Sequence, residues 1–408
     1  LMTPRACSMF GSIVLACVTS STIAQDADSR VIVHIVKPSQ VEPTDERVEK
    51  LKLPSGFRIA KFAEGLGNPR MMAIADDGSV YVTRRTQGDV LRLVDADGDG
   101  KAESRDTVLE RKGVHGICIH QSRVYLATVK DIAVCDISSD GRFGQPTVLA
   151  RDLPDGAQHP NRTIAVGPDR ALYCSIGSSC NACVETNEEH ATMLRFALDG
   201  SGRSIFCTGL RNTLGFAWQP GTGDLYGADH GIDDLGDDTQ KEELNLIVRG
   251  RNYGWPYIYE DGQFNPVPPL LPGMTKEQLI SGNTAPVLTF TAHAAPMNLV
   301  FIPESSAWPK EYSGDALVSL RGSWNRKPPS GYEVVRVRFK NGKPDKVEDF
   351  LSGFLMQNGK SHFGRPVGLA FARDGSLLIS DDTCGVIYRV WRARDGEPDR
   401  ASGPRIGG

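Results

Sequence analysis

Apolar and polar residues alternate in a sequence pattern, called here the repeated phrase, that recurs along the chain from about residue 50. Each copy has an alternating apolar run, a turn containing Gly or Asp, and a second apolar run, usually with an aromatic residue. Alternation with a period of two predicts β-strands joined by tight turns. Most copies continue into a third run of the same kind, such as residues 386–390. The six copies lie at residues 72–82, 116–126, 163–174, 215–226, 299–318 and 368–379.

Copies that return at intervals of roughly 45 to 80 residues are typical of propeller blades, which pack around a channel because one blade cannot bury both faces. The sequence therefore predicts an all-β fold, a six-bladed β-propeller with four-stranded antiparallel blades, over residues 51–392. Two separate β-sandwiches are the competing architecture, but they would not explain the repeated phrase. The Pro-rich stretch 257–286 is expected to form long rim loops with a short helix near residues 276–279.

The composition narrows the class of protein. The chain has 408 residues, 46 Lys and Arg, 50 Asp and Glu, and a formal charge of −4. Its 40% hydrophobic and 24% charged residues exclude a disordered chain, a coiled coil and a polytopic membrane protein. The near-neutral balance gives no basic field for nucleic acid, so we expect no nucleic-acid partner.

The N-terminus has the pattern of a secretory signal peptide. Arg5 precedes the apolar stretch 9–16, and a small-x-small site ends at Ala24. We therefore expect a signal peptide at residues 1–24, a linker at 25–50, a flexible tail at 393–408 and a periplasmic or secreted protein without a transmembrane segment. Lipidation at Cys17 is the alternative route of export, and an unstructured tail with an accidental apolar run is the remaining interpretation.

Cleavage of that leader would leave seven cysteines, an odd number, so at least one thiol stays free or pairs outside the chain. Cys180 and Cys183 form a lone CxxC. A zinc site would need a second pair at matching spacing, and the sequence has none. A local disulfide or two unpaired buried thiols are the two interpretations that remain.

Alternating carboxylates form a possible calcium loop. Asp95, Asp97 and Asp99 precede Gly100, and Asp106 occupies the twelfth position of the loop. This spacing resembles a calcium-binding loop, in which carboxylates converge on a hard cation, although flanking helices are not expected here. A solvated hairpin turn is the alternative.

Polar residues also recur in the loops that enter or leave the predicted inner strands, which meet at one mouth of a propeller. Together they form a site rich in Arg and His. Such a site suits a polyanionic ligand, because the guanidinium fork matches a carboxylate, and a neutral His supplies a general base. These residues are His159, Arg211, Asn212, His230, His293, Arg321, Trp324, Arg326 and Arg365.

At these residues the sequence resembles the quinoprotein glucose/sorbosone dehydrogenase family, six-bladed propellers that bind pyrroloquinoline quinone (PQQ) and calcium. The resemblance extends from about Leu53 to Trp391. Its most specific stretches are LRNTLGFAW, EELNLIVRGRNYGWP, GSWNR and FGRPVGLAFARDGSLLISDD. GSSCNAC and DADGDGKAE indicate the sorbosone-dehydrogenase-like branch.

The resemblance implies a role for each site residue. His159 would be the general base that removes the proton of the substrate hydroxyl. Arg211 would be the second catalytic residue and would contact the reactive carbonyl edge of the cofactor. Carbonyls of Gly231 and Ile232 would hold the cofactor calcium. The residues expected to bind the cofactor are Arg211, Asn212, His230, His293, Arg321, Trp324, Arg326 and Arg365.

The implied activity is oxidation of an aldose or related sugar aldehyde by hydride transfer to PQQ. No CxxCH is present for a covalent haem, so electrons would leave to an external acceptor. Gln158 stands where the glucose enzymes have an Asp beside the catalytic His, so the orientation of His159 must come from elsewhere. The alternatives are a non-catalytic binding propeller and a calcium-dependent lactonase-type hydrolase.

Overall fold

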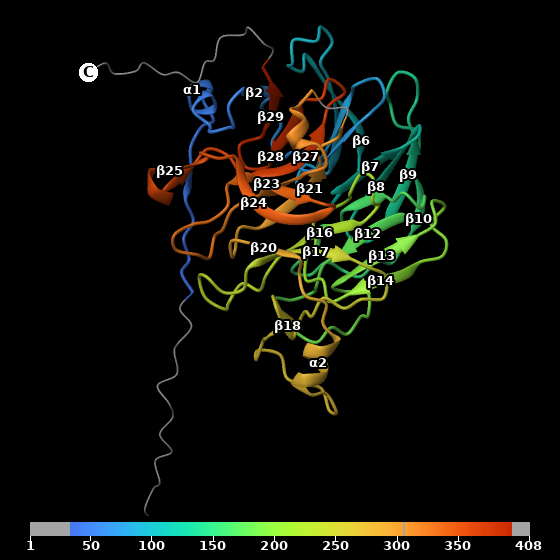
Figure 1. Ribbon diagram of the computed structural model, residues 1–408. Helices are drawn as coiled ribbons and strands as arrows, with labels where there is room; N and C mark the ends of the chain where they lie inside the picture. The colour runs from blue at the N-terminus through green and yellow to red at the C-terminus, as the bar shows by residue number, and fades with distance from the viewer. Residues whose placement is uncertain (1–32, 305–306, 394–408) are drawn as a thin grey trace, which may run out of the picture. The chain divides into compact units, whose positions relative to one another are not determined.

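The computed structural model describes residues 33–304 and 307–393. The expected signal peptide and almost all of the expected tail lie outside these residues. Within them the fold is all-β, with six four-stranded antiparallel sheets (Figure 1). This confirms the predicted fold class and the four-stranded antiparallel sheets.

The first three sheets follow one another in chain order. The first contains β3 (Met72–Ile74), β4 (Val80–Arg84), β5 (Asp89–Val94) and β6 (Ser104–Glu110). The second contains β7 (Gly116–His120), β8 (Arg123–Ala127), β9 (Ile132–Asp136) and β10 (Thr147–Ala150). The third contains β11 (Ile164–Val166), β12 (Leu172–Ile176), β13 (Thr192–Phe196) and β14 (Ser204–Thr208).

The fourth sheet contains β15 (Gly215–Trp218), β16 (Leu225–Asp229), β17 (Glu242–Ile247) and β20 (Leu288–Phe290). The fifth contains β21 (Pro296–Phe301), β22 (Ala316–Leu320), β23 (Glu333–Lys340) and β24 (Lys343–Leu351). The sixth contains β27 (Pro366–Phe371), β28 (Leu377–Asp381), β29 (Val386–Arg392) and β2 (Phe57–Ala63). Each copy of the repeated phrase falls on the first two strands of one sheet.

The first strands of neighbouring sheets lie against one another. β3 contacts β7 and β27, β7 contacts β11, and β21 contacts β15 and β27. Glycine permits this approach: a Cβ on Gly116 would lie 2.6 Å from the Arg162 carbonyl oxygen, and one on Gly368 would lie 2.2 Å from that of Arg70. A larger residue there would force the sheets apart.

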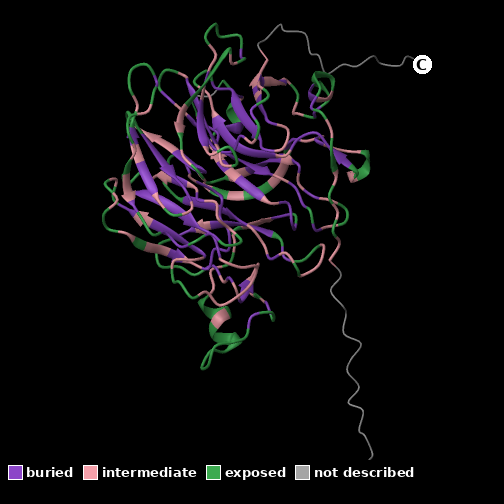
Figure 2. Cartoon of the chain, turned by 180° about the vertical axis from the view of Figure 1, so that it is seen from behind, coloured by how far each residue is buried: buried purple, intermediate pink, exposed green. Residues whose placement is uncertain are grey.

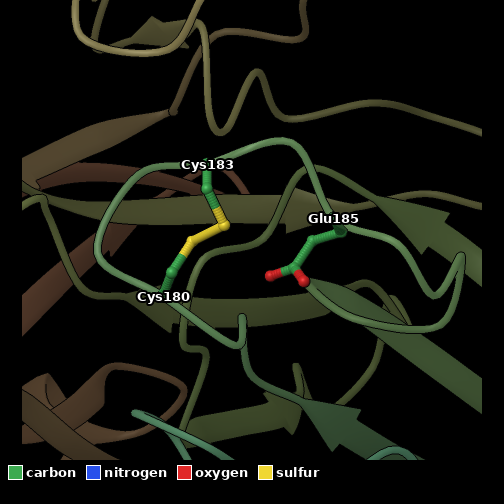
Figure 3. Close-up of side chains that lie close together, drawn as sticks. All are labelled: Cys180, Cys183 and Glu185. Carbon is green, nitrogen blue, oxygen red and sulfur yellow. A yellow bond between two sulfur atoms is a disulfide. The ribbon is translucent and has the colours of Figure 1, made fainter.

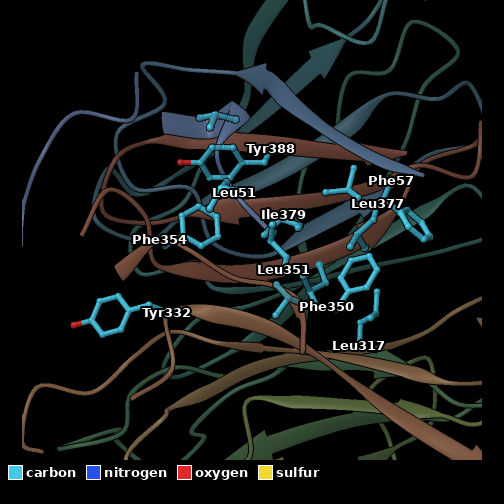
Figure 4. Packing of buried hydrophobic residues seen from close by; sticks show 14 of the residues in the cluster. Leu51, Phe57, Leu317, Tyr332, Phe350, Leu351, Phe354, Leu377, Ile379 and Tyr388 are labelled. Carbon is cyan, nitrogen blue, oxygen red and sulfur yellow. The ribbon is translucent and has the colours of Figure 1, made fainter. Parts of the chain in front are cut away.

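The sixth sheet joins the two ends of the described chain. β2 pairs antiparallel with β29, so that Phe57 lies opposite Arg392. The Phe57 ring packs edge-on against Trp308 at 4.7 Å and Phe350 at 5.5 Å, in a buried cluster between the fifth and sixth sheets (Figure 4). Because β2 and β29 are more than 300 residues apart in sequence, this pairing ties the early and late parts of the fold together.

Shorter elements lie outside these sheets. α2 (Lys276–Gly282) begins with a capping box between Thr275 and Gln278, which confirms the short helix expected in the Pro-rich stretch. It lies on an exposed excursion of the chain (Figure 2). None of the helices in the described residues has the length and apolar character of a membrane span. The other short elements outside the six sheets are β1 (Ser39–Gln40), α1 (Asp45–Glu49), β18 (Ile258–Tyr259), β19 (Gln263–Phe264), β25 (Leu355–Met356), β26 (Ser361–His362), and 3-10 turns at Lys310–Tyr312 and Gln357–Gly359.

Residues 33–41, in the expected linker, contact the loop that carries Trp324 and the strand that carries His362. The Val36 amide donates to the Trp324 carbonyl at 3.0 Å, and the Val41 amide donates to the His362 carbonyl at 2.9 Å. β1 pairs in parallel with β26. The segment is therefore held by the loop that follows β22 and by β26.

Candidate active site

Polar residues stand just before the first strand of several sheets, as the repeat predicts. Two of them, Arg70 and His115, were not identified from the sequence. His115 is fully buried; its Nε2 lies 3.2 Å from Arg70 and its Nδ1 donates to the Arg162 carbonyl at 2.9 Å. Both lie one to three residues ahead of the first strand of a sheet, as Asn212 and Arg365 do, and this shared position is the sequence signal that would have identified them.

His159 is half-buried, and its ring orientation is fixed by Ser178. Its Nδ1 lies 2.9 Å from both the carbonyl and the hydroxyl oxygen of Ser178. A carbonyl oxygen can only accept, so Nδ1 carries the proton and Nε2 keeps its lone pair. Burial, and then the charge of Arg211, lowers the pKa of His159 to about 2. The ring is therefore neutral, and among the described residues no donor forms a hydrogen bond to the Nε2 lone pair.

Arg211 is buried and is held by a loop and a carboxylate. Its Nε donates to the Asn181 carbonyl at 3.0 Å, and one terminal nitrogen donates to Asn181 Oδ1 at 2.7 Å and to Asp233 at 3.1 Å. The backbone amides of Arg211 and Asn212 both donate to the carboxylate of Asp229. Burial raises the pKa of Asp229 to about 6 even though these donors oppose the shift.

His230 lies beside Asn212 and uses both ring nitrogens. Its Nε2 donates to the Pro296 carbonyl at 2.6 Å, and its Nδ1 faces the Asn212 amide nitrogen at 3.5 Å. Burial lowers the pKa of His230 to about 4, so the ring is neutral. His230 thus aligns Asn212 and joins the loop after β16 to the start of β21.

Two side chains orient the loop that follows His230. The Gly231 amide donates to Glu242 at 2.7 Å, and the Ile232 amide donates to Gln240 at 2.9 Å. The other oxygen of Glu242 accepts from the Ala295 amide at 2.8 Å. Within the described residues, no donor forms a hydrogen bond to the carbonyl oxygen of Gly231 or Ile232.

Arg321 and Arg70 share one buried carboxylate. Arg321 Nε lies 3.0 Å from both oxygens of Asp382, and Arg70 also pairs with Asp382. Burial alone would raise the pKa of Asp382, but the charges of Arg70 and Arg321 outweigh burial and lower it. Asp382 therefore stays ionised between two cations.

Arg365 is close to this pair, but its guanidinium forms no salt bridge with a carboxylate of the described residues. Its Nε donates to the Arg321 carbonyl at 3.0 Å, another nitrogen donates to the Gly322 carbonyl, and the guanidinium lies 5.2 Å from the Tyr332 ring. Burial, reinforced by the charge of Arg321, lowers the pKa of Arg365 to about 10. The cluster of Arg70, Arg321 and Arg365 therefore has more positive than negative charge.

Three other predicted cofactor residues have different surroundings. His293 donates to the Gly236 carbonyl at 2.7 Å, and its Nδ1 faces the Asn325 amide at 3.1 Å, so both ring nitrogens are occupied. Arg326 is paired with Asp238 at 2.7 Å. Trp324 is 43% exposed. Their assignment to the cofactor stays a prediction.

Cys180 and Cys183 form a disulfide, which decides between the two interpretations of the CxxC. The other five cysteines of the described residues are free thiols. Glu185 lies beside the disulfide (Figure 3), but the bonded sulfurs offer no thiolate for a metal. Cys180, Cys183 and Glu185 are thus not a metal site in this oxidised form.

The acidic hairpin needs one correction. Asp95, Asp97 and Asp99 come together as expected, but the fourth carboxylate is that of Glu103 and not Asp106. Asp106 lies in β6 opposite Arg92, because the chain reverses after Gly100 and starts a new strand. The calcium occupancy expected for this exposed hairpin stays a prediction.

A model of the TrAA12-like family matches residues 51–393. The chain belongs to the TrAA12-like family. This result confirms the predicted relationship to PQQ-dependent sugar dehydrogenases, while the sorbosone-like branch stays a prediction.

One relative of this TrAA12-like protein by sequence is the pyrroloquinoline quinone-dependent pyranose dehydrogenase of Coprinopsis cinerea. It is 25% identical over 419 residues, which cover 84% of this chain and 55% of that protein. The chain therefore spans about half the length of that enzyme.

Solved structures share the fold of this TrAA12-like protein. The holo form of the pyranose dehydrogenase PQQ domain from C. cinerea has a TM-score of 0.73 at 21% identity, covering 88% of this chain and 100% of that one. A calcium structure of the Trichoderma reesei family AA12 enzyme has a TM-score of 0.72 at 20% identity, covering 85% and 98%.

Proposed function

We propose that this protein is an exported quinoprotein that oxidises a sugar, or a sugar aldehyde of the aldose or sorbosone type, by hydride transfer to PQQ. The observation that carries the proposal is the neutral, oriented His159 close to Arg211, in a site with an excess of arginine. The relatives that are named for PQQ-dependent sugar oxidation support the same conclusion.

We also propose that the six sheets are the blades of a six-bladed propeller. The contacts between successive first strands support this arrangement, as does β2, which completes the sixth sheet from the opposite end of the chain. In such a ring the positions before the first strands converge on one mouth of the channel.

The donor set fits a planar tricarboxylate such as PQQ. Among the described residues, only Asp382 and Asp233 pair with the arginines of the site. Arg321 uses only its Nε within these residues, which leaves both terminal amino groups to bind a ligand carboxylate. Arg365 has one such group. The arginines concerned are Arg70, Arg211, Arg321 and Arg365.

The loop after His230 fits calcium. Free backbone carbonyls are oxygen ligands of the kind that calcium prefers, and those of Gly231 and Ile232 accept no hydrogen bond from the described residues. Glu242 and Gln240 fix this loop through its amides. When bound, PQQ would supply the hydride-accepting chemistry and calcium would supply Lewis-acid polarisation at this loop.

The chain's own groups perform the acid–base and electrostatic work. Nε2 of His159 takes the proton of the substrate hydroxyl, because Nδ1 is committed to Ser178. Arg211 and Asn212 hold the reactive edge of the cofactor, where positive charge favours the electron-rich product. The proposal includes export by the signal peptide expected at residues 1–24 and transfer of the electrons to an external acceptor.

Titration of purified, metal-stripped protein with PQQ, with and without calcium, tests the proposal through the quinone absorbance. We expect a stoichiometric complex that requires calcium and then turns over sugars with a redox dye. Absence of binding under both conditions would support the non-catalytic propeller instead.

The same titration tests the roles of single residues. His159→Ala should keep cofactor affinity and lose turnover roughly a hundredfold or more. Arg365→Gln should weaken cofactor binding, whereas Arg373→Gln, which removes an exposed partner of Asp76, should not. Equal affinity of both arginine variants would refute the clamp.

A further inference from the structure

One short loop touches both proposed catalytic groups. Residues 178–183 follow β12, and the Cys180–Cys183 disulfide closes the loop into a ring. Ser178 contacts His159 from one end of the loop, and Asn181 contacts Arg211 from inside the ring. Neither contact was predicted, and neither residue belongs to the cofactor site that the family resemblance implies.

Ser178 is fully buried and joins three parts of the site. Its amide donates to the Arg211 carbonyl at 2.8 Å, and its hydroxyl donates to the Cys180 carbonyl at 2.7 Å. The hydroxyl has a single proton, which is committed to Cys180, so its oxygen can only accept from His159 Nδ1. Both oxygens of Ser178 therefore favour the tautomer with the proton on Nδ1.

Asn181 makes contacts in several directions at once. Its carbonyl accepts from Arg211 Nε at 3.0 Å and from the Trp255 indole at 3.1 Å. Its side-chain oxygen accepts from Arg211 at 2.7 Å and from the Asp233 amide at 2.9 Å, and its amide group donates to Asp234 at 2.8 Å. Both acceptors of one residue thus bind the same guanidinium.

We propose that the disulfide-closed loop of residues 178–183 is the positioning element of the site, in which Ser178 sets the tautomer of His159 and Asn181 sets the plane of Arg211. The proposal deepens the proposed function and rests on it. Ser178 and Asn181 act through His159 and Arg211, so they are positioning residues. Gln158 occupies the place of an Asp and does not orient His159. The loop of residues 178–183 orients His159 instead, through Ser178.

The first test opens the ring and keeps its polar groups. The double variant Cys180→Ser/Cys183→Ser of the calcium- and PQQ-loaded protein should lose kcat roughly ten- to a hundredfold, because small displacements of oriented groups cost that much. KM should change less than kcat. The melting temperature should shift by only a few degrees, because a disulfide that spans so short a segment closes a small loop.

Matched variants separate positioning from general damage. Asn181→Ala should reproduce the loss of kcat. Asn181→Asp combined with Asp234→Asn, which keeps the side-chain acceptor for Arg211 and restores an amide–carboxylate pair between positions 181 and 234, should recover most of it. Asp234→Asn is the control, because among the described residues Asp234 accepts a side-chain hydrogen bond from the amide of Asn181 alone. That variant should keep wild-type kcat.

A second readout does not depend on turnover. In cofactor-free protein labelled with ¹⁵N-histidine, the His159 ring should show a protonated Nδ1 and an unprotonated Nε2, with His159→Gln used to assign the signals. Opening of the disulfide should give a mixture of both tautomers. Asp234→Asn should leave the wild-type pattern.

The two proposals fail in different ways. A wild-type protein that neither binds PQQ nor oxidises sugars would refute the proposed function, and the tautomer measurement would still judge the loop. If the wild type turns over and the double cysteine variant keeps its kcat and its tautomer, the positioning role is overturned. A loss of kcat that only follows a loss of melting temperature, with an unchanged tautomer, would also overturn it.

Discussion

Asp382 is the residue whose replacement gives the sharpest test of the charge balance in the site. Its carboxylate is 1% exposed and lies between Arg70, whose side chain is 9% exposed, and Arg321, at 28%. Asp382→Asn keeps the shape of the side chain and removes only the negative charge. The two guanidinium groups would then face each other and Arg365 without a counter-ion.

The expected cost follows from burial. Removal of one partner of a buried ion pair costs about 3–5 kcal/mol, because the remaining charge is left unpaired away from water. The unfolding entropy is about 2.1 cal/mol/K per residue, so over the roughly 340 residues matched by the family model each kcal/mol shifts Tm by about 1.4 °C. Asp382→Asn should therefore lower the Tm of the cofactor-free protein by about 4–7 °C.

Differential scanning calorimetry of the two proteins, with and without PQQ and calcium, measures this shift. Asp136→Asn is the control: it breaks a pair whose side chains are 56% and 80% exposed, and such pairs contribute about 1 kcal/mol or less. Ligand carboxylates should restore more stability in the Asp382 variant than in the wild type. A cofactor-free variant that melts within about 1 °C of the wild type would show that Asp382 does not balance this cluster.

Three further predictions concern protonation and packing. Burial raises the pKa of Glu243 to about 8, well above its ordinary value of 4.5, so the folded protein binds a proton there that the unfolded chain releases. The free energy of unfolding should therefore fall as pH rises from about 4.5 to about 8, the unfolded and folded pKa values, and Glu243→Gln should flatten that slope in urea titrations. Because the pKa of His159 is lowered to about 2, kcat/KM should not fall off on the acid side near pH 6.5. A decrease near pH 6.5 that is present in the wild type and absent in His159→Gln would contradict this prediction. A Cβ on Gly177 would lie 2.5 Å from that of His159, so Gly177→Ala should reduce kcat roughly a hundredfold, whereas Gly144→Ala, which meets only ordinary contacts, should not.

The sheets could be predicted from the sequence because the residues that specify each strand pair lie close together in the chain. Alternating apolar residues and Asp–Gly turns specify a strand pair within about 20 residues, and the Asp77 carboxylate caps the first such turn by accepting from the Ser79 amide at 2.9 Å. The same contact recurs between Asp374 and Ser376. The short helix was also predictable, since Thr275 begins it with a standard cap.

Contacts that cross the fold were not predictable in the same way. Arg70 and Asp382 are 312 residues apart, and no pattern in either segment indicates the other. The support of His159 comes partly from a backbone carbonyl, which leaves no mark in the choice of amino acids. The acidic hairpin was assigned the wrong fourth carboxylate because the spacing rule assumes a continuous loop, whereas the chain turns into β6 before Asp106.

A count of arginines therefore does not give the charge of the site, because the partners decide which guanidinium groups can bind a ligand. Arg211 uses its nitrogens on Asn181 and Asp233, and so it is a fixed, oriented donor. Within the described part of the chain, Arg321 uses only its Nε, on a carboxylate that it shares with Arg70. It follows that substitutions around Arg211 should act on turnover, through geometry, while substitutions around Arg321 should act on cofactor affinity, through charge.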